Sequence, residues 1–273
     1  MHMHLAFATD GRVDHILGIA ALLNRLALMS CQPAAVWIAA PADLHARVRH
    51  TVSGSSPWTP LCVDAAAEPD DPYGIQLRLG DIFRSVPAGE PVWALDHDHL
   101  VAGRVRAPRV DRGCIRASSE PPLPYRRRGG DIGWSLNVSM LAGFACDLAR
   151  VADVWRPAYE DLSSHVSERH RGEAAFCWSA ERCGVSLRRV PSAVQSNFAA
   201  AAAHAFLFHY GGDTAAALAL KTELRRLSAT PDVGCDAVHD YLLGTLRRFS
   251  QATPASSTSC SPPRRYARPT ARP

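Results

Sequence analysis

The stretch Val92-Trp-Ala-Leu-Asp-His-Asp-His-Leu-Val101 joins an apolar run to two acidic residues that stand two positions apart. A short apolar run that ends in polar residues is typical of a buried strand, here over residues 91–95. If the chain stays extended, Asp96 and Asp98 share one face, because side chains alternate along a strand. Two carboxylates this close repel each other, and a divalent cation such as Mg²⁺ or Mn²⁺ relieves that repulsion. A polar turn without any ligand is the alternative interpretation.

The N-terminal part of the chain alternates between strand and helix. Apolar runs at 5–8, 35–40 and 61–63 predict strands, and apolar positions at helical spacing over 16–29 predict a helix. A second helix is expected over 43–50, with an aspartate as its cap. This alternation is typical of an α/β fold with a mainly parallel sheet and helices on its faces. Open sheets of this kind bind ligands outside the carboxyl ends of their strands, which is where the two aspartates are expected.

The rest of the chain divides into further elements, a loop and a tail. Residues 103–133 are rich in Arg, Gly and Pro and lack periodicity, so they predict a long surface loop. After Phe249 the composition shifts to Ser, Thr, Pro and Arg, which is typical of disorder. We therefore predict one domain over residues 1–249 and a disordered basic tail over 250–273. Further helices are expected at 73–85, 146–155, 172–183 and 213–227, and further strands at 134–144, 185–190 and 205–209.

The charge distribution sets the tail apart from the body. Lys and Arg total 30 and Asp and Glu total 26, so the formal net charge is +4. Residues 251–273 contain four arginines, from Arg264 to Arg272, and no acidic residue, so the body is formally neutral. An excess this small excludes a body that binds nucleic acid through its overall charge. The tail could make a weak, salt-sensitive contact with an anionic membrane surface.

Hydropathy and cysteine usage bear on the compartment. The sequence has no uncharged apolar stretch of about 18 residues or more, so a membrane-spanning helix is not expected. The start, Met1 to Leu5, lacks the basic and long apolar regions of a signal peptide. The 8 cysteines are scattered and include no C-x-x-C pair, which favours reduced thiols over a disulfide framework. These features predict a cytoplasmic protein.

The stretch around Asp96, together with Arg78-Leu79 before it, resembles the R-L and Y-L-D-x-D-x-x-V sequences of GT-A glycosyltransferases. The closest likeness is to the family 8-like group of retaining enzymes. Further blocks agree with that group in their order along the chain, so that the resemblance covers residues 5–212. Each block is short, and their shared order is what supports the resemblance. The blocks are Phe7-Ala-Thr9-Asp10, Leu136-Asn-Val-Ser-Met-Leu141, Gly172-Glu-Ala-Ala-Phe176 and Phe208-His-Tyr-Gly-Gly212.

The resemblance implies a GT-A (Rossmann-like) fold and transfer of a sugar from a nucleoside-diphosphate sugar to an acceptor. It implies that Asp96, Asp98 and His209 bind Mn²⁺ or Mg²⁺, which would act as a Lewis acid toward the leaving nucleoside diphosphate. Neither the donor sugar nor the acceptor follows from it. The other roles that it implies are Thr9, Asp10 and His97 beside the nucleotide, Arg78 at the diphosphate, Asn137 at the sugar and in catalysis, and Glu173 as a catalytic acid residue near the acceptor.

The sequence departs from that family at several positions. Ser139 stands where glycine is usual, and Val138 replaces a small polar residue, which alters the expected sugar pocket. The lysine that often follows the histidine block is missing, and Lys221, the chain's single lysine, stands well beyond it. Arginine is an adequate bidentate partner for phosphate, so Arg78, or Arg104 and Arg106 by their proximity to the Asp-x-Asp stretch, would have to meet the diphosphate.

Two other classes of function stay open on the sequence. A sugar-phosphate nucleotidyltransferase shares the sheet and the paired carboxylates, although the first strand is followed by Thr9-Asp-Gly-Arg12 rather than by a glycine-rich loop. A non-catalytic relative could keep the fold as a binding surface, because a fold does not determine a function. Single residues also have ordinary structural interpretations, with His209 at a strand end, Glu173 on a helix face and Thr9 in a helix cap.

Overall fold

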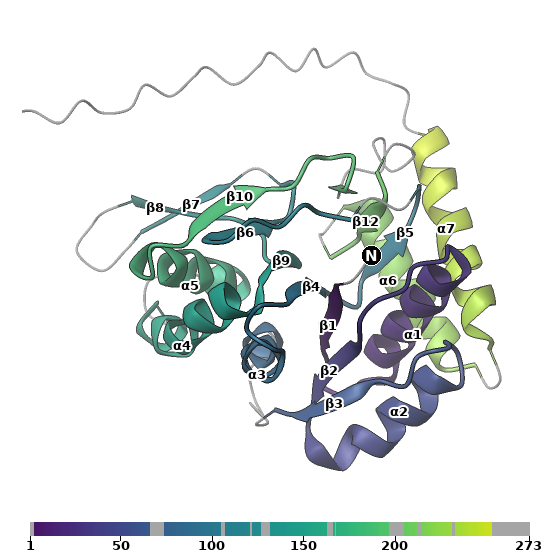
Figure 1. The fold of residues 1–273 in the computed structure, drawn as a ribbon. Helices are drawn as coiled ribbons and strands as arrows, with labels where there is room; N and C mark the ends of the chain where they lie inside the picture. Colours follow the sequence, from purple (N-terminus) through teal and green to yellow (C-terminus); the bar gives the residue numbers. More distant parts are fainter. Residues whose placement is uncertain are drawn as a thin grey trace, which may run out of the picture.

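The computed structural model describes residues 3–65, 74–104, 107–120, 122–126, 132–162, 166, 168–196, 205–211, 214–230 and 233–252. Its centre is a seven-stranded sheet with the order β10-β6-β9-β4-β1-β2-β3 (Figure 1). Strand β1 pairs in parallel with β2 and β4, β3 with β2, and β10 with β6, whereas β9 runs antiparallel to β4 and β6. This is the mixed, mainly parallel sheet that the sequence predicts. The strands are β1 (His4–Ala8), β2 (Val36–Ala40), β3 (Leu61–Asp64), β4 (Pro91–Leu95), β6 (Cys114–Ala117), β9 (Met140–Phe144) and β10 (Ser186–Arg189).

Helices cover both faces of this sheet (Figure 1). Leu5 and Phe7 of β1 belong to one buried cluster, whereas Ala6 and Ala8 belong to another on the opposite face. Because both faces are buried, the strands are continuous apolar runs rather than alternating ones. The first cluster includes residues of α1 (Val13–Leu28), α2 (His45–Ser53), α6 (Ala215–Ser228) and α7 (Cys235–Ala252), and the second those of α3 (Leu79–Ser85), α4 (Ala145–Asp161) and α5 (Glu168–Arg182); the 3-10 turns η1 (Ala42–Leu44) and η2 (Gly74–Arg78) precede α2 and α3.

Two small sheets complete the described part of the chain. β5 (His99–Val101) pairs antiparallel with β12 (Leu207–His209), which pairs in parallel with β11 (Gln195–Ser196). The register places His209 opposite His99. β7 (Leu123–Arg126) and β8 (Ile132–Ser135) form an antiparallel pair beside α5. The pairing of β5 with β12 brings together two segments about a hundred residues apart in sequence.

The prediction of a long surface loop over residues 103–133 is wrong. This stretch contains β6, which lies inside the main sheet, and β7. Ile115 and Ala117 of β6 are fully buried. The strand is only four residues long and carries an arginine at its third position, so its apolar pattern is too short to detect among the surrounding arginines and glycines.

The single strand predicted over 134–144 is two separate strands, β8 and β9, with residues 136–139 between them. In this interruption Asn137 accepts a hydrogen bond from the backbone N–H of Ser139 at 2.8 Å through its own side-chain oxygen. An asparagine that bonds its own backbone two residues on favours a turn over a continuing strand.

Helix α7 is absent from the sequence-based prediction. It extends from Cys235 to Ala252 and so passes the expected end of the domain at residue 249. Val238, Leu242 and Leu246 recur at helical spacing and are buried in the same cluster as α1 and α6. The tail from residue 253 onward lies outside the described residues, and its contact with an anionic membrane stays a prediction. Among the described helices, none has the length and apolarity needed to cross a membrane.

The burial of α7 makes its apolar face a determinant of stability. Leu242 is 1% exposed, so Leu242→Ala leaves a cavity and should lower the free energy of unfolding by about 2–5 kcal/mol. Arg247→Ala on the exposed side of the same helix should change it by less than about 0.5 kcal/mol. Urea unfolding followed by circular dichroism measures both values, and equal effects of the two substitutions would contradict the packing of α7.

His239 on α7 should make stability depend on pH. Its Nε2 accepts a hydrogen bond from the backbone N–H of Val101 at 3.2 Å, and burial, helped by Arg25, lowers its pKa to about 4. The contribution of His239 to the free energy of unfolding is complete above pH 6.5, the pKa of histidine in the unfolded chain. It is lost as the pH falls toward 4, since between these two values only the unfolded state takes up the proton.

In that window His239→Gln should reduce the dependence of unfolding free energy on pH by up to about 1.4 kcal/mol per pH unit. Urea unfolding in EDTA at a series of pH values between neutral and the folded pKa measures the slope. The same slope in the variant and in the wild type would refute the assignment.

Candidate functional site

The Asp-x-Asp stretch forms a turn at the carboxyl edge of the main sheet. Strand β4 ends at Leu95, and β5 begins at His99, with Asp96 and Asp98 in the turn between them. The chain is not extended here, since the backbone turns between β4 and β5 and leads back toward β12. The backbone N–H of Asp96 donates to the carbonyl of Ser139 at 2.9 Å, and that of Tyr210 donates to the carbonyl of Asp98 at 3.0 Å. The turn is therefore held from both sides.

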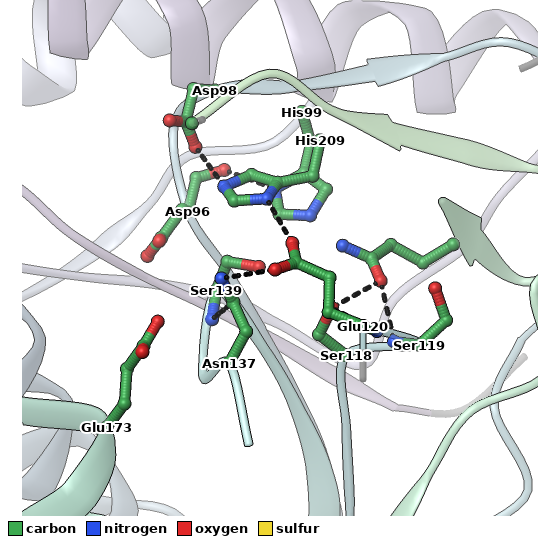
Figure 2. A network of polar contacts seen from close by, with 12 residues as sticks. Asp96, Asp98, His99, Ser118, Ser119, Glu120, Asn137, Ser139, Glu173 and His209 are labelled. Atoms are coloured by element: carbon green, nitrogen blue, oxygen red, sulfur yellow. Dashed lines mark hydrogen bonds and ion pairs between the residues drawn. The ribbon is translucent and has the colours of Figure 1, made fainter. Parts of the chain in front are cut away.

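The turn and the end of β12 bring Asp96, Asp98 and His209 together. Each residue offers an oxygen or nitrogen atom that could ligate a metal, and these atoms lie within 4.8 Å of one another. Nε2 of His209 lies 3.3 Å from Oδ1 of Asp98, and the His209 ring stacks on that of His99 at 4.9 Å between centroids. Figure 2 shows both aspartates on the same side of the imidazole. These are the three residues that the sequence assigns to a metal.

The electrostatics of this cluster favour a positive charge between the carboxylates. Burial raises the pKa of Asp96, and the charge of Asp98 raises it further. Burial also opposes ionisation of Asp98, but the neighbouring His209 outweighs it and holds the pKa of Asp98 well below its usual range. For His209 burial lowers the pKa, yet Asp98 and Glu120 together raise it to about 10. A protonated imidazole is thus stabilised by two carboxylates.

The residues fit a divalent cation. Asp98 Oδ1 is buried, and the only donor it meets in the described part of the protein is the His209 imidazole at 3.3 Å, so a cation could take the place of that imidazolium proton. Gly211 keeps space open beside the ligand atoms, because a Cβ there would lie 2.8 Å from Oδ2 of Asp98 and closer still to Nε2 of His209. Two carboxylates and an imidazole suit Mn²⁺ and related ions. The triad could therefore hold such an ion.

A cavity of about 390 Å³ opens beside the two aspartates of the triad. Asp96 and Asp98 line it together with Glu173 of α5. Cationic side chains reach the same cavity from the start of α1 and from α6. These are Arg12, Lys221 and Arg225. The carboxylates could hold a cation, and the basic side chains carry positive charge of their own. Together they suit an anionic ligand.

Lys221 reaches the site although its position in the sequence gives it no role there. Its Nζ donates to the carbonyl of Gly211 at 2.7 Å, although twelve positions separate it from His209 in the sequence. Helix α6 returns the chain toward the triad, so a separation along the sequence becomes proximity in space. In the sequence, Lys221 is distinguished only by being the single lysine of the chain.

Thr9 and Asp10, expected beside the nucleotide, follow the end of β1. Thr9 is fully buried, and its hydroxyl accepts the backbone N–H of Gly11 at 3.0 Å. Asp10 forms ion pairs with His15 at 2.9 Å and with Arg12 at 3.3 Å. Burial opposes its ionisation, but these partners hold its pKa far below the usual range.

Arg78 and Gln76 approach the same edge from η2. Arg78 is 4% exposed, and its Nη1 donates to the carbonyl of Thr9 at 2.6 Å. Burial lowers its pKa, while the charge of Asp10 opposes that shift. Nε2 of Gln76 donates to Oδ2 of Asp96 at 3.1 Å. Arg78 therefore joins η2 to the end of β1, and Gln76 orients one carboxylate of the triad.

His97, Asn137 and Glu173 surround the triad. His97 lines the cavity and stacks on His15 with 3.6 Å between ring centroids, and burial lowers its pKa to about 4. Glu173 faces the cavity and pairs with His170 at 3.1 Å. The amide of Asn137 donates to Glu120, a residue to which the sequence motifs assign no role. Arg104 is exposed, and Arg106, Gly212 and Asp213 lie outside the described residues.

Solved structures of two glycosyltransferases are similar to the fold of this chain. The galactosyltransferase LgtC, solved with donor and acceptor sugar analogs, is similar with a TM-score of 0.54 and 13% identity, over 84% of this chain and 98% of that one. The chain has the GT-A fold. The glycosyltransferase GlyE of Streptococcus pneumoniae TIGR4 has a TM-score of 0.54 at 13% identity, over 94% of this chain and 66% of that chain.

The GT-A fold is thus shared at low sequence identity, as the resemblance in the sequence implies. A second structure of GlyE, in its apo form, is similar with a TM-score of 0.50 and 12% identity, over 92% of this chain and 64% of that one. No protein-family model matches the sequence, and no curated protein matches it.

The space beside Gly211 can be tested directly. Gly211→Ala places a methyl group against Nε2 of His209 and Oδ2 of Asp98, so Mn²⁺ binding should weaken by about 10–100-fold. Gly89→Ala is the matched control, because a Cβ at Gly89 would meet no atom within 4 Å. Electron paramagnetic resonance of free Mn²⁺, with and without excess UDP or GDP, gives the affinities. Equal affinities of the two variants would argue against a cation at the triad.

Proposed function

We propose that this protein is a metal-dependent glycosyltransferase that moves a sugar from a nucleoside-diphosphate sugar to an acceptor. The observation that carries the proposal is the Asp96–Asp98–His209 triad, whose two aspartates line a cavity with basic side chains at the carboxyl edge of a GT-A sheet. Ligands of open α/β sheets bind at this edge. The glycosyltransferase LgtC, whose structure was solved with donor and acceptor analogs, supports the reaction class through its fold.

In this proposal Asp96, Asp98 and His209 hold Mn²⁺ or Mg²⁺. A divalent cation bound there supplies Lewis-acid stabilisation of the negative charge that develops on the departing diphosphate. Gln76 orients Asp96 through its amide, and the stacked His99 limits the motion of the His209 ring. Burial of the cluster strengthens these interactions, because the surrounding dielectric is lower than that of water.

Basic residues at the cavity complement the diphosphate. We assign phosphate contacts to Lys221 and Arg225 of α6 and to Arg12 at the start of α1, since all three line the cavity that Asp96 and Asp98 also line. Lys221 provides the positive charge that the sequence lacks directly after the histidine block. Arg78 is not assigned a phosphate contact, because its guanidinium is buried and already bonded to the carbonyl of Thr9. It supports the end of β1 instead.

The sugar and the acceptor are assigned to the side of the cavity where Glu173 lies. Glu173 is an acidic residue that lines the cavity together with Asp96, so it is suited to contact hydroxyl groups. Asn137 lies in the segment whose Ser139 carbonyl anchors Asp96, which places it next to the triad. His97 lines the cavity at the end of β4, and Asp10, at the end of β1, pairs with the lining residue His15. We expect the nucleoside at this part of the cavity.

Isothermal titration calorimetry with UDP and with GDP tests the proposal. In Mn²⁺ the wild type should bind at least one of them about tenfold more tightly than in EDTA, because a cation held by the triad would offset the negative charge of the diphosphate. Asp98→Ala should lose this gain, whereas Asp43→Ala, an exposed acid in η1, should retain it. If binding of both nucleotides is independent of Mn²⁺, the proposal is wrong.

The products that the protein forms distinguish a glycosyltransferase from a nucleotidyltransferase that synthesises the donor. Wild-type protein with Mn²⁺ should slowly hydrolyse one member of a panel of UDP-sugars and GDP-sugars, with release of the nucleoside diphosphate. Release of pyrophosphate from a nucleoside triphosphate and a sugar phosphate would instead identify a nucleotidyltransferase.

A further inference from the structure

Glu120 lies on the side of the His209 ring that faces away from Asp98. Nε2 of His209 is 3.3 Å from Asp98, whereas Nδ1 donates to Oε1 of Glu120 at 3.4 Å. Figure 2 shows the imidazole between the two carboxylates. The two ring nitrogens of a histidine thus have separate partners, one toward the cavity and one toward the protein.

The second oxygen of Glu120 reaches a different part of the site. Oε2 accepts a hydrogen bond from Nδ2 of Asn137 at 3.3 Å, and the side-chain oxygen of Asn137 accepts the N–H of Ser139 at 2.8 Å. The carbonyl of Ser139 in turn accepts the N–H of Asp96. A single carboxylate therefore joins one member of the triad to the segment that anchors another.

The chain around Glu120 is held independently of His209. The backbone N–H of Ser119 and the hydroxyl of Ser118 both donate to Oε1 of Gln195, at 3.0 and 2.8 Å. Gln195 is fully buried and belongs to β11, which pairs with the strand that carries His209. Figure 2 shows the two serines directly before Glu120. The segment directly before Glu120 is thus bonded to the small sheet that carries His209, through contacts that do not involve the His209 side chain.

We propose that Glu120 is the positioning residue of the metal site. It accepts the Nδ1 proton of His209, so that Nε2 carries the lone pair directed at the cation, and it holds the ring in the plane that faces Asp98. This inference rests on the proposed function of the triad. A carboxylate or carbonyl bonded to the remote nitrogen of a metal-bound histidine sets its tautomer and orientation. Glu120 is not among the residues whose atoms converge on the cation site.

The affinity for Mn²⁺ tests the role of Glu120. Electron paramagnetic resonance of free Mn²⁺, alone and with excess UDP or GDP, should give a dissociation constant about 10–100-fold higher for Glu120→Ala than for the wild type. Glu120→Gln keeps an acceptor oxygen for the Nδ1 proton and should fall between them. Glu90→Ala, an exposed acid outside the site, should match the wild type. Thermal unfolding in EDTA checks that each variant is folded.

The tautomer of His209 gives a readout that a purely structural residue would not change. In protein with ¹⁵N-labelled histidine and bound Cd²⁺ as a diamagnetic probe, His209 should carry its proton on Nδ1 in the wild type and in Glu120→Gln. Glu120→Ala should add a second form in which Cd²⁺ is bound by Nδ1 and the proton is on Nε2, because no carboxylate then accepts the Nδ1 proton.

The outcomes separate this inference from the proposed function. Unchanged Mn²⁺ affinity and an unchanged tautomer in folded Glu120→Ala and Glu120→Gln, with binding lost in Asp98→Ala, overturn the role of Glu120 alone. Absence of Mn²⁺ binding to the wild type, both alone and with either nucleotide, overturns the proposed function together with this inference.

Discussion

The antiparallel pairing of β5 with β12 is the constraint on which the site depends. β5 follows the Asp96–Asp98 turn directly, and its register sets His209 opposite His99. This pairing is what brings the His209 imidazole to the two aspartates. The pairing is itself supported from outside, because His239 of α7 accepts the N–H of Val101 and β11 flanks β12 on its other edge. A helix at the C-terminal end of the described chain therefore stabilises a site built on its middle.

Buried carboxylates are costly unless charge and hydrogen bonds compensate for their desolvation. Here Asp98 and Glu120 raise the pKa of His209. Asp96 has a raised pKa of its own and accepts a hydrogen bond from the amide of Gln76. A divalent cation would stabilise the charges of these carboxylates more than any single side chain does. The two apolar clusters on either face of the sheet provide the stability that lets this edge remain electrostatically strained.

Sequence patterns predict the features that depend on local order. The strand and helix alternation of the first 65 residues, the apolar run before Asp96 and the order of short blocks lead to the fold and to the three residues of the triad. Features that depend on contacts between distant segments are not predictable in this way. β6 is too short to show a period, α7 lies beyond the last block, and Lys221 and Glu120 reach the site through α6 and the turn after β6. Their local sequences resemble those of ordinary surface residues, since only the tertiary structure gives them a partner.

The central claim is that Asp96, Asp98 and His209 bind a divalent cation that contacts a nucleoside diphosphate. A crystal structure of the protein with Mn²⁺ and the nucleoside diphosphate that binds most tightly, measured at a wavelength where manganese scatters anomalously, tests it most directly. The account predicts one anomalous peak in contact with these three side chains and with the diphosphate oxygens, with Lys221 on the same phosphates. A peak elsewhere, or a bound nucleotide with no manganese at the triad, would contradict it.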